Sequence, residues 1–478
     1  MSGNAEWVDP RSDVTTNAVN WDVLLDIVCK YTQVASATWG EQKVGNDNII
    51  RFLHLSKQVE DSDDATSTTM IVKVPFRPTE GSPSEFMPNL CDRVASEVAT
   101  MEYIEKYTTI PSPRVVYHST DPDQDGVGLP FLITTEVQGV RLHDVWDNMA
   151  DEQRDIVLAQ VVDILLQLSE HRFDKIGALF KSEKGGEGKA AWEVRPPRFG
   201  FTHSAVENAT YRSGADYLTA LANALLRDEF EQEFGAPAKP YSYAILWTMR
   251  SFIPAFCDFT LDTAGFPLLP SDFLPRNIFI TDAHSHPRIS GILSWRYTTT
   301  AATSIFAQCP LLIVDKPVWD PHHHLRPRNK RDQDSFHAMM LKAEKERYPD
   351  GDQPLSRAFK KSRGIYLLNQ CLEYYGSPIW SELYPQLFEY VFDGQEFSEE
   401  YNEALLAGIL AKEFAVFEQE TEVWGEAEDV FGDELDSDDR PTRTKFLEMV
   451  TEHRDRLPSG GEVNQWLDAK DWTKIILP

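Results

Sequence analysis

Cysteine is scarce in this chain, and long apolar runs are missing from it. The five cysteines are scattered along 478 residues, and none forms a Cys-x-x-Cys pair. Neither a disulfide framework nor a zinc knuckle is therefore indicated. The first residues, MSGNAEWVDPRSD, are polar, and no apolar run reaches membrane-spanning length. We expect a reduced, cytoplasmic protein without a membrane segment.

Positive charge is also in deficit. The chain has 46 lysine and arginine residues against 76 aspartate and glutamate residues, which gives a formal net charge of -30. Such a surface repels nucleic acids and anionic membranes unless basic residues gather in one patch. The nearest candidate, HHHLRPRNKR at residues 322–331, is short and interrupted by proline, and we expect a solvated loop there. Neither nucleic acid nor membrane is expected as a partner.

Apolar residues, in contrast, are plentiful. Hydrophobic residues make up 42% of the chain, with 12 tryptophans, 16 tyrosines and 26 phenylalanines. This composition excludes a mostly disordered chain. The length indicates two to four domains or one large unit with two lobes.

The first part of the chain mixes strands with one helix. Residues 1–20 are polar and are interpreted as an extension. Strands are predicted at residues 48–57, 67–76 and 128–139, and a helix at 92–105. The helix is indicated by Val94, Val98, Met101 and Ile104, which recur at steps of four, three and three and so form one apolar stripe.

The pattern becomes mainly helical from residue 140 onward. Helices are predicted at residues 151–171, 214–233 and 241–256 and over most of the chain after about 330. The segments NIFIT (277–281) and ISGIL (289–293) predict a hairpin. Two stretches are expected to lack regular structure: a mobile insertion rich in glycine and charge at 181–198, and an acidic, solvated loop at 425–439.

Lys73 and Glu97 are the first candidates for chemistry. Lys73 lies on a predicted strand, where it either snorkels to solvent or reaches a buried anion. Glu97 lies on the apolar stripe of the predicted helix, where a carboxylate needs a partner. A strand lysine paired with a helix glutamate is how kinase-type sites hold the α- and β-phosphates of a nucleotide. The alternative is a salt bridge at the rim of the fold.

Asp272 and Asn277 stand five residues apart in SDFLPRN. In phosphoryl transfer the aspartate accepts or orients the proton of the attacking hydroxyl, and the asparagine binds Mg²⁺ through its amide oxygen. The spacing alone is weak evidence, because a chain of this length contains about one such pair by chance. Its place before a hairpin strand, and after the lysine strand and the glutamate helix, strengthens it.

Together these stretches resemble the aminoglycoside phosphotransferase and choline kinase group of protein-kinase-like folds, in particular its fungal-type branch. The resemblance spans roughly residues 30–320 and is carried, in order, by SEVATMEYIEKYTTIPSPRVV (96–116), FLITTEVQGVRLHDVWDNM (131–149), LSEHRFDKIGALF (168–180), LLPSDFLPRNIFI (268–280) and ISGILSWRY (289–297). It implies an α+β fold with two lobes, a small antiparallel β lobe and a large, mainly helical lobe, with ATP bound between them.

The resemblance also implies a role for each site residue. Lys73 would contact the phosphates with Glu97 as its ion-pair partner, Asp272 would be the catalytic aspartate, and Asn277 would bind Mg²⁺. The remaining cofactor-binding positions are Glu136, Val137 and Gln138 of the hinge and Gly45 of the phosphate-covering loop KVGNDNII (43–50). Because that loop has one glycine, less of its backbone can approach the phosphates.

Three departures from the family pattern matter. PSD (270–272) stands where the family usually has His-Gly-Asp, and LSWR (293–296) stands where it has Ile-Asp-Trp-Glu. Ser294 thus replaces the carboxylate expected to bind Mg²⁺ directly, and a neutral hydroxyl is a far poorer ligand for that ion. Arg296 replaces a glutamate and adds positive charge where the site usually carries negative charge.

Two functions remain open on this basis. The first is ATP-dependent phosphoryl transfer to a hydroxyl of an unidentified small molecule, impaired by the loss of one magnesium ligand. The second is a catalytically inactive pseudokinase that binds a nucleotide or acts as a scaffold. The domains expected are an N-terminal extension (1–20), a small nucleotide-binding lobe (21–137), a large lobe with the catalytic loop (138–330) and a C-terminal helical part that packs on it (331–478).

Overall fold

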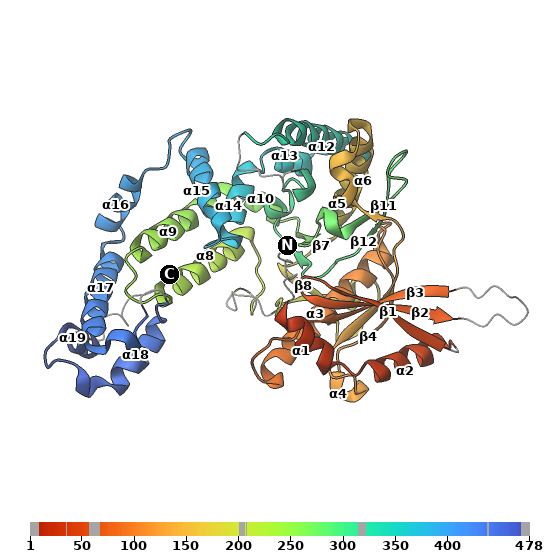
Figure 1. Ribbon diagram of the computed structural model, residues 1–478. Coiled ribbons are helices and arrows are strands. Elements are labelled where there is room, and N and C mark those ends of the chain that lie inside the picture. The colour runs from red at the N-terminus through yellow and green to blue at the C-terminus, as the bar shows by residue number, and fades with distance from the viewer. Residues whose placement is uncertain are drawn as a thin grey trace, which may run out of the picture. The chain divides into compact units, whose positions relative to one another are not determined.

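The computed structural model describes residues 9–469 except for 35, 57–66, 200–205, 207, 314–321 and 437–438. The chain divides into two compact units. Unit 1 comprises Met1–Ser213 and Phe259–Lys361, and unit 2 comprises Gly214–Asp258 and Ser362–Pro478. Unit 1 holds the described sheets and unit 2 is built from helices, so the predicted α+β class, with an antiparallel sheet near the N-terminus and a large helical part, is confirmed (Figure 1).

An antiparallel five-stranded sheet forms the first part of unit 1. Its order is β1-β2-β3-β5-β4, and its strands are β1 (Ser36–Val44), β2 (Asn48–Ser56), β3 (Ser67–Pro75), β4 (Val115–Ser119) and β5 (Phe131–Thr135). In β2, Ile49, Leu53 and Leu55 are buried at odd-numbered positions, because alternate side chains of a strand point to the same face. The strands predicted at 48–57 and 67–76 are confirmed, and the one predicted at 128–139 is shorter.

Helices cover this sheet, and the longest of them begins earlier than predicted. They are α1 (Pro10–Ala18), α2 (Trp21–Thr32), α3 (Pro83–Tyr107) and α4 (Pro122–Asp125). The prediction for α3 followed its apolar stripe and began at residue 92. The helix begins at Pro83 because Glu85 accepts a hydrogen bond from the backbone N–H of Ser82 (2.8 Å), a capping pattern that the stripe does not include. Phe86 and Leu90 of this first part join the buried core of the sheet.

The rest of unit 1 combines short strands with helices. Its elements are β6 (Val140–Arg141), α5 (Leu142–Val145), η1 (Trp146–Asn148), α6 (Asp151–Glu170), β7 (Arg172–Phe173), β8 (Gly177–Lys181), η2 (Gly188–Ala191), β9 (Trp192–Arg195), α10 (Phe259–Asp262), β10 (Phe266–Leu269), η3 (Pro275–Asn277), β11 (Ile278–Thr281), β12 (Arg288–Ile292), β13 (Thr299–Thr300), α11 (Thr303–Phe306), η4 (Leu311–Ile313), α12 (Arg326–Arg347) and α13 (Pro354–Lys360). The predicted hairpin is β11–β12, which joins β6 in a sheet of order β12-β11-β6. The other sheet has the order β7-β10-β13-β8-β9.

Helices α6 and α12 lie side by side in unit 1 (Figure 1). The buried Arg154 of α6 donates through Nε to the fully buried carboxylate of Asp332 on α12 (3.0 Å). The basic run at 322–331 was predicted to be a solvated loop, and this is wrong from Arg326 onward, where α12 begins. The surrounding acidic side chains neutralise the run, since Arg328 pairs with Asp147.

Two stretches expected to be irregular are partly ordered. The 181–198 segment contains β9, which pairs antiparallel with β8, and Trp192 of β9 is buried and donates through Nε1 to the carbonyl of Ala99 (3.1 Å). The acidic stretch at 425–439 begins inside a helix that runs to Phe431, with Ala427 and Phe431 buried and the acidic residues on other faces. Both predictions were based on the local composition of the segment, which is rich in charge or glycine. They did not take account of the few apolar side chains in each segment that are buried.

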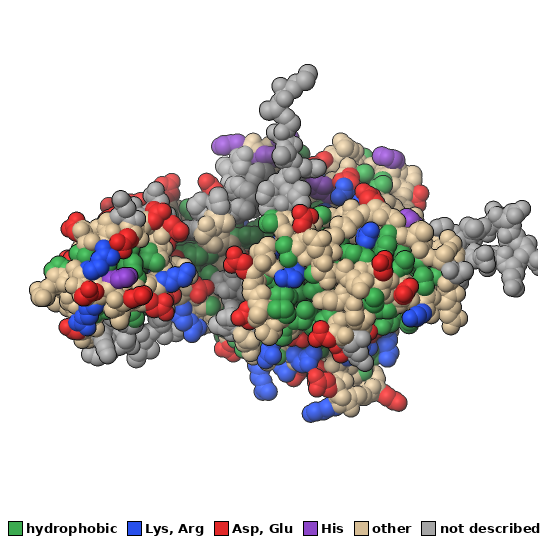
Figure 2. All heavy atoms as spheres, turned by 60° about the horizontal axis from the view of Figure 1, so that its bottom comes forward, with side chains coloured by type: hydrophobic (Ala, Val, Ile, Leu, Met, Phe, Trp, Pro, Cys, Tyr) green, Lys and Arg blue, Asp and Glu red, His purple; other side chains and the backbone are tan. Residues whose placement is uncertain are grey.

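Unit 2 is made of helices gathered around their own apolar core. Its elements are α8 (Gly214–Glu231), α9 (Lys239–Phe256), α14 (Arg363–Glu373), α15 (Pro378–Val391), α16 (Glu399–Ala407), α17 (Ala411–Phe431), η5 (Gly432–Glu434), α18 (Arg443–Glu452), η6 (Arg454–Arg456) and α19 (Glu462–Ala469). Trp424, Phe446 and Trp466 lie in one buried cluster of this unit. Among the helices that the structure describes, none is both long and apolar enough to cross a membrane. Acidic and basic side chains are interspersed over the face seen in Figure 2.

Candidate functional site

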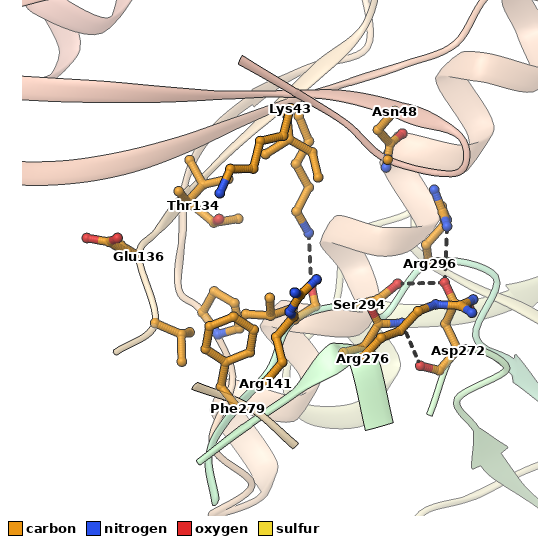
Figure 3. A pocket seen from close by; sticks show the side chains of 18 of the residues that line it. Lys43, Asn48, Thr134, Glu136, Arg141, Asp272, Arg276, Phe279, Ser294 and Arg296 are labelled. Atoms are coloured by element: carbon orange, nitrogen blue, oxygen red, sulfur yellow. Dashed lines mark hydrogen bonds and ion pairs between the residues drawn. The ribbon is translucent and has the colours of Figure 1, made fainter. Parts of the chain in front are cut away.

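A cavity of about 680 Å³ opens in unit 1, lined by residues of that unit alone. One side is formed by the small sheet and by the loop between β1 and β2. The other side is formed by the segment after β5, by the loop before β11 and by the segment after β12. Figure 3 shows Lys43 reaching into the cavity from the sheet, with Arg141 and Phe279 facing it from the opposite side. The segments predicted to carry the chemistry thus meet around one cavity.

Lys73 and Glu97 form an ion pair in this cavity. Lys73 on β3 places its Nζ 3.1 Å from Oε1 of Glu97 on α3 and 2.9 Å from the carbonyl oxygen of Leu293. Both side chains are mostly buried, with 13% and 8% of their surface exposed. The lysine therefore does not snorkel to solvent. It connects the small sheet and α3 to the segment that follows β12.

Asp272 lies on the loop between β10 and β11, and its carboxylate is surrounded by donors. Its Oδ2 accepts a hydrogen bond from the hydroxyl of Ser294 and another from Nη2 of Arg296, each at 3.1 Å. Its Oδ1 lies 3.5 Å from Nη2 of Arg276, which is about half exposed. The predicted catalytic carboxylate is thus paired with two arginines.

Asn277 supports the loop that carries Asp272. Its Nδ2 donates to the backbone carbonyl of Asp272 (3.0 Å), and its own backbone carbonyl accepts from the N–H of Leu293 (2.8 Å). These bonds join the loop before β11 to the segment after β12. The side chain of Asn277 lines the cavity, but its role as a metal ligand remains a prediction.

Arg296 occupies the centre of the charged group. Its Nη2 lies 3.1 Å from Oδ2 of Asp272 and 3.2 Å from Oδ2 of Asp47, which belongs to the loop between β1 and β2. The side-chain amide of Asn48 satisfies its neighbours when its oxygen and nitrogen are exchanged. In that orientation the amide oxygen accepts a hydrogen bond from Nη1 of Arg296 (2.9 Å). Burial acts to lower the pKa of Arg296, but the surrounding Tyr297 and carboxylates outweigh it and raise the pKa. Figure 3 shows Arg296 between Asp272 and Asn48.

The hinge and the loop between β1 and β2 both border the cavity. Glu136 is exposed and points away from the cavity in Figure 3. The carbonyl of Gln138 accepts a hydrogen bond from Ser290 (2.6 Å), which fixes the hinge on the hairpin. Gly45 closes the turn by donating its N–H to the carbonyl of Asn48 (2.9 Å). All of these residues, with Val137, line the cavity except Ser290.

The donor set does not fit a magnesium ion. That ion prefers several oxygen ligands, above all carboxylates. Here Ser294 uses its hydroxyl as a donor to Asp272, and the cation Arg296 already lies between Asp272 and Asp47. No group of three or more His, Cys, Asp or Glu residues in the described part of the chain could hold a metal. The charge that a metal would supply is present as a guanidinium.

Sequence reasoning missed several residues of the site. Asp47 was inside the predicted phosphate-covering loop but was given no role, and Lys43, Arg141 and Phe279 were not singled out. A signal for Asp47 existed: an unexpected arginine in the metal-binding motif needs a carboxylate partner. Which carboxylate it meets follows only from the folded chain.

Comparisons with known proteins give short or distant matches. No family model matches the chain. It is 30% identical over 90 residues to a subtelomeric hrmA-associated cluster protein of Aspergillus fumigatus strain Af293, a match that covers 19% of this chain and 17% of that protein. A protein of the same description from strain CEA10 is 31% identical over 87 residues, covering 18% and 17%. The chain therefore covers less than a fifth of the length of these relatives.

Two solved structures resemble the chain at low identity. The complex of gentamicin with APH(2")-IIa is 13% identical, covers 77% of this chain and 95% of its own, and gives a TM-score of 0.42. The GDP complex of wild-type aminoglycoside 2'-phosphotransferase-IIIa is 13% identical, covers 78% and 100%, and gives a TM-score of 0.37.

Proposed function

We propose that this protein is a kinase-like nucleotide-binding protein in which phosphoryl transfer is impaired. The small lobe (21–137) and the part of the large lobe (138–330) that lies in unit 1 would enclose a nucleoside triphosphate in the cavity. Lys73, held by Glu97, would contact the phosphates, and the hinge backbone at 136–138 would meet the base. The cavity is large enough for such a ligand, since ligand pockets commonly measure about 300–1,000 Å³.

One observation carries the impaired activity. The carboxylate of Asp272 is held by Ser294, Arg296 and Arg276, so both of its oxygens already have a partner. An attacking hydroxyl would have to displace one of these donors before it could place its proton on the carboxylate. The donor set also holds a magnesium ion poorly. The site therefore favours binding over transfer.

The charge around the cavity supports an anionic ligand. Five of the described lining residues are basic (Lys43, Lys73, Arg141, Arg276 and Arg296) and three are acidic (Glu97, Glu136 and Asp272). Asp47 adds one more carboxylate at the edge. This balance contrasts with the formal net charge of -30 of the whole chain. Lys43 and Arg141 are also paired with Glu41 and Asp144, so the lining is close to neutral and is a more favourable place for a polyphosphate than an acidic surface.

A second candidate is an active phosphotransferase acting on a hydroxyl of a small molecule. It is favoured by the fact that Lys73, Glu97, Asp272 and Asn277 all lie at the same cavity. The chain does not identify that small molecule. If this candidate holds, the wild type transfers phosphate from ATP to an acceptor and Asp272→Asn abolishes the transfer without loss of fold. Equal turnover in both would rule it out.

Thermal unfolding tests the proposed function. The protein is heated with millimolar ATP or GTP, in magnesium or in excess EDTA. A nucleotide at a hundredfold over its dissociation constant should stabilise the protein by about 2.7 kcal/mol. A rise in the unfolding temperature with either nucleotide, and no phosphate transfer to water or to a panel of hydroxyl compounds, is the expected result. Unchanged unfolding in every condition would contradict nucleotide binding.

A further inference from the structure

The cation that serves this site lies within the chain itself. Building on the proposed nucleotide binding, we infer that Arg296 takes the place of a divalent metal. Its guanidinium binds the phosphates of the nucleotide directly, after Asp47 has released it. Asp47 is then a displaceable counter-ion that occupies a phosphate position while the cavity is empty of ligand.

The position of Arg296 supports this role. The two carboxylate oxygens on its Nη2 come from two different loops that border the cavity, Asp272 from the loop before β11 and Asp47 from the loop between β1 and β2. A carboxylate and a phosphate present similar anionic oxygens to a guanidinium. A cation that already joins two anions across a cavity can exchange one of them for a phosphate oxygen. No divalent ion is needed for that exchange.

Arg296 also has hydrogen-bonding capacity left for a ligand. A guanidinium carries five N–H donors. Its side chain is 11% exposed, and its Nε is buried without a hydrogen-bond partner among the described residues. An unsatisfied buried donor costs free energy, which an entering phosphate would recover. The tetrahedral group of a phosphate offers several acceptors for the fork at once.

Asp47 has somewhere to go when it is displaced. Its Oδ1 lies 3.8 Å from Nη1 of Arg11, whose neighbouring Nη2 is held by Asp9. The carboxylate is about a quarter exposed and belongs to a short turn closed by Gly45 and Asn48. A small rotation of the side chain would leave Asp47 paired with Arg11 and solvent. The loop could then stay closed over the phosphates.

The test measures ATP affinity by calorimetry in excess EDTA and in excess magnesium chloride. We expect the wild type to bind ATP in EDTA, with an affinity in magnesium within about threefold of that value. Arg296→Ala should lose about tenfold or more of the affinity in EDTA, as expected when charge-assisted hydrogen bonds to phosphate are removed. Binding that requires magnesium would overturn the inference and leave the proposed nucleotide binding intact. Absence of ATP binding in both buffers would overturn both.

Arg328→Ala is the matched control. Arg328 is 14% exposed, pairs with one aspartate (Asp147, 2.9 Å) and also has a buried, unpartnered Nε among the described residues. It does not line the cavity. Arg328→Ala removes an arginine that is buried to a similar extent as Arg296 but lies outside the cavity. The ATP affinity of this variant should therefore stay at the wild-type value. An equal loss of affinity in Arg328→Ala and Arg296→Ala would mean that only the fold was disturbed, and would overturn the inference.

Asp47→Asn gives an independent readout that does not depend on the stability of Arg296→Ala. If Asp47 competes with phosphate, its removal should tighten ATP binding in EDTA several-fold although it weakens an ion pair of the free protein. A purely structural Asp47–Arg296 bridge predicts the opposite, because its loss would loosen the loop. Unchanged or weaker ATP binding by Asp47→Asn would therefore contradict the exchange. Inorganic tripolyphosphate, measured alongside ATP, should show the same order of variants.

Discussion

At the scale of single residues, the site depends on charges that are buried in pairs. Lys73 and Glu97 satisfy each other at 3.1 Å with little exposure to solvent. Either side chain without the other would destabilise the fold. A buried charge loses its hydration, and without a partner no ion pair or hydrogen bond compensates for that loss. The same reasoning applies to Arg296, which would be strongly disfavoured in this place without Asp47 and Asp272.

A double-mutant cycle tests the first pair. We expect Lys73→Met to lower the free energy of unfolding by about 3 kcal/mol, since it leaves Glu97 buried and alone. Adding Glu97→Leu should restore much of the loss, because the unsatisfied carboxylate is gone. Urea unfolding of the four proteins measures both effects. Lys43→Met, at a lysine that is 54% exposed, serves as a control and should change stability by less than about 1 kcal/mol. Additive losses in the double variant would show that the two charges do not depend on each other.

Restoring the missing metal ligands tests the fit of the site at the same scale. In the variant Ser294→Asp, Arg296→Glu, the two new carboxylates would join Asp272 and Asp47, and the half-exposed Arg276 would be the cation left beside Asp272. We expect the variant to unfold at a lower temperature in EDTA and to be stabilised by millimolar Mg²⁺, which has no such effect on the wild type. Magnesium-dependent ATP binding should appear with it. A variant indifferent to magnesium would show that the loss of metal binding is not due to these two positions.

At the scale of elements, unit 1 is held together by ion pairs between helices as well as by apolar cores. Asp332 of α12 is fully buried and accepts from Arg154 of α6. Asp332 directly follows the basic run at 322–331, which was predicted to be a solvated loop. A solvated loop and a helix that buries only one face can both be rich in charged residues. The composition of 322–331 therefore could not distinguish between them.

Substitutions on α12 separate buried from exposed pairs. Asp332→Ala should lower the free energy of unfolding by about 3 kcal/mol, because Arg154 remains buried without its main partner. Asp334→Ala on the same helix removes an exposed partner of Lys330, with 62% and 68% of the two side chains accessible, and should cost less than about 0.5 kcal/mol. Chemical denaturation measures both. Similar losses in the two variants would show that the Arg154 interaction contributes little.

The backbone of the hinge has its own constraint at this scale. Gly139 has a φ of +124°, and a Cβ there would lie 2.4 Å from the carbonyl oxygen of Ile280. Only glycine lets the hinge lie this close to β11. The turn from β5 to β6 and the hairpin therefore form one support for the cavity, although they are far apart in the sequence.

At the scale of the whole molecule, the two units have separate cores and the cavity belongs to unit 1 alone. The chain visits unit 2 twice, in Gly214–Asp258 and from Ser362 onward. A division by sequence position at 137 and 330 could not reveal this, because discontinuous units leave no boundary in composition. The predicted lobes remain a proposal.

Hydrogen exchange tests where a nucleotide acts in the whole chain. We expect ATP to slow exchange in residues 43–50, 134–139 and 272–296, the segments that contain most of the residues lining the cavity. Helix α17 (Ala411–Phe431) of unit 2 is the internal reference and should exchange as it does without ATP. Mass spectrometry of peptides from the full chain resolves these segments. Protection in α17 equal to that in the cavity segments would place the nucleotide effect elsewhere.

The sequence by itself determined the α+β class, most strands and helices near the site, and the candidate residues Lys73, Glu97, Asp272 and Asn277. It could do so because periodicity and short motifs are local properties of the chain. Through the resemblance it also predicted that Ser294 stands in place of a magnesium ligand and that Arg296 adds a cation.

Only the tertiary structure decided which carboxylates pair with Arg296. Arg296 comes after β12, whereas its partner Asp47 comes between β1 and β2, and nothing local to either residue relates them. Ion-pair partners are chosen by the packing of distant segments around a shared cavity, where low exposure makes every unmatched charge costly. The sequence therefore predicted that a metal ligand is missing, and the fold showed that Arg296 is held between two carboxylates.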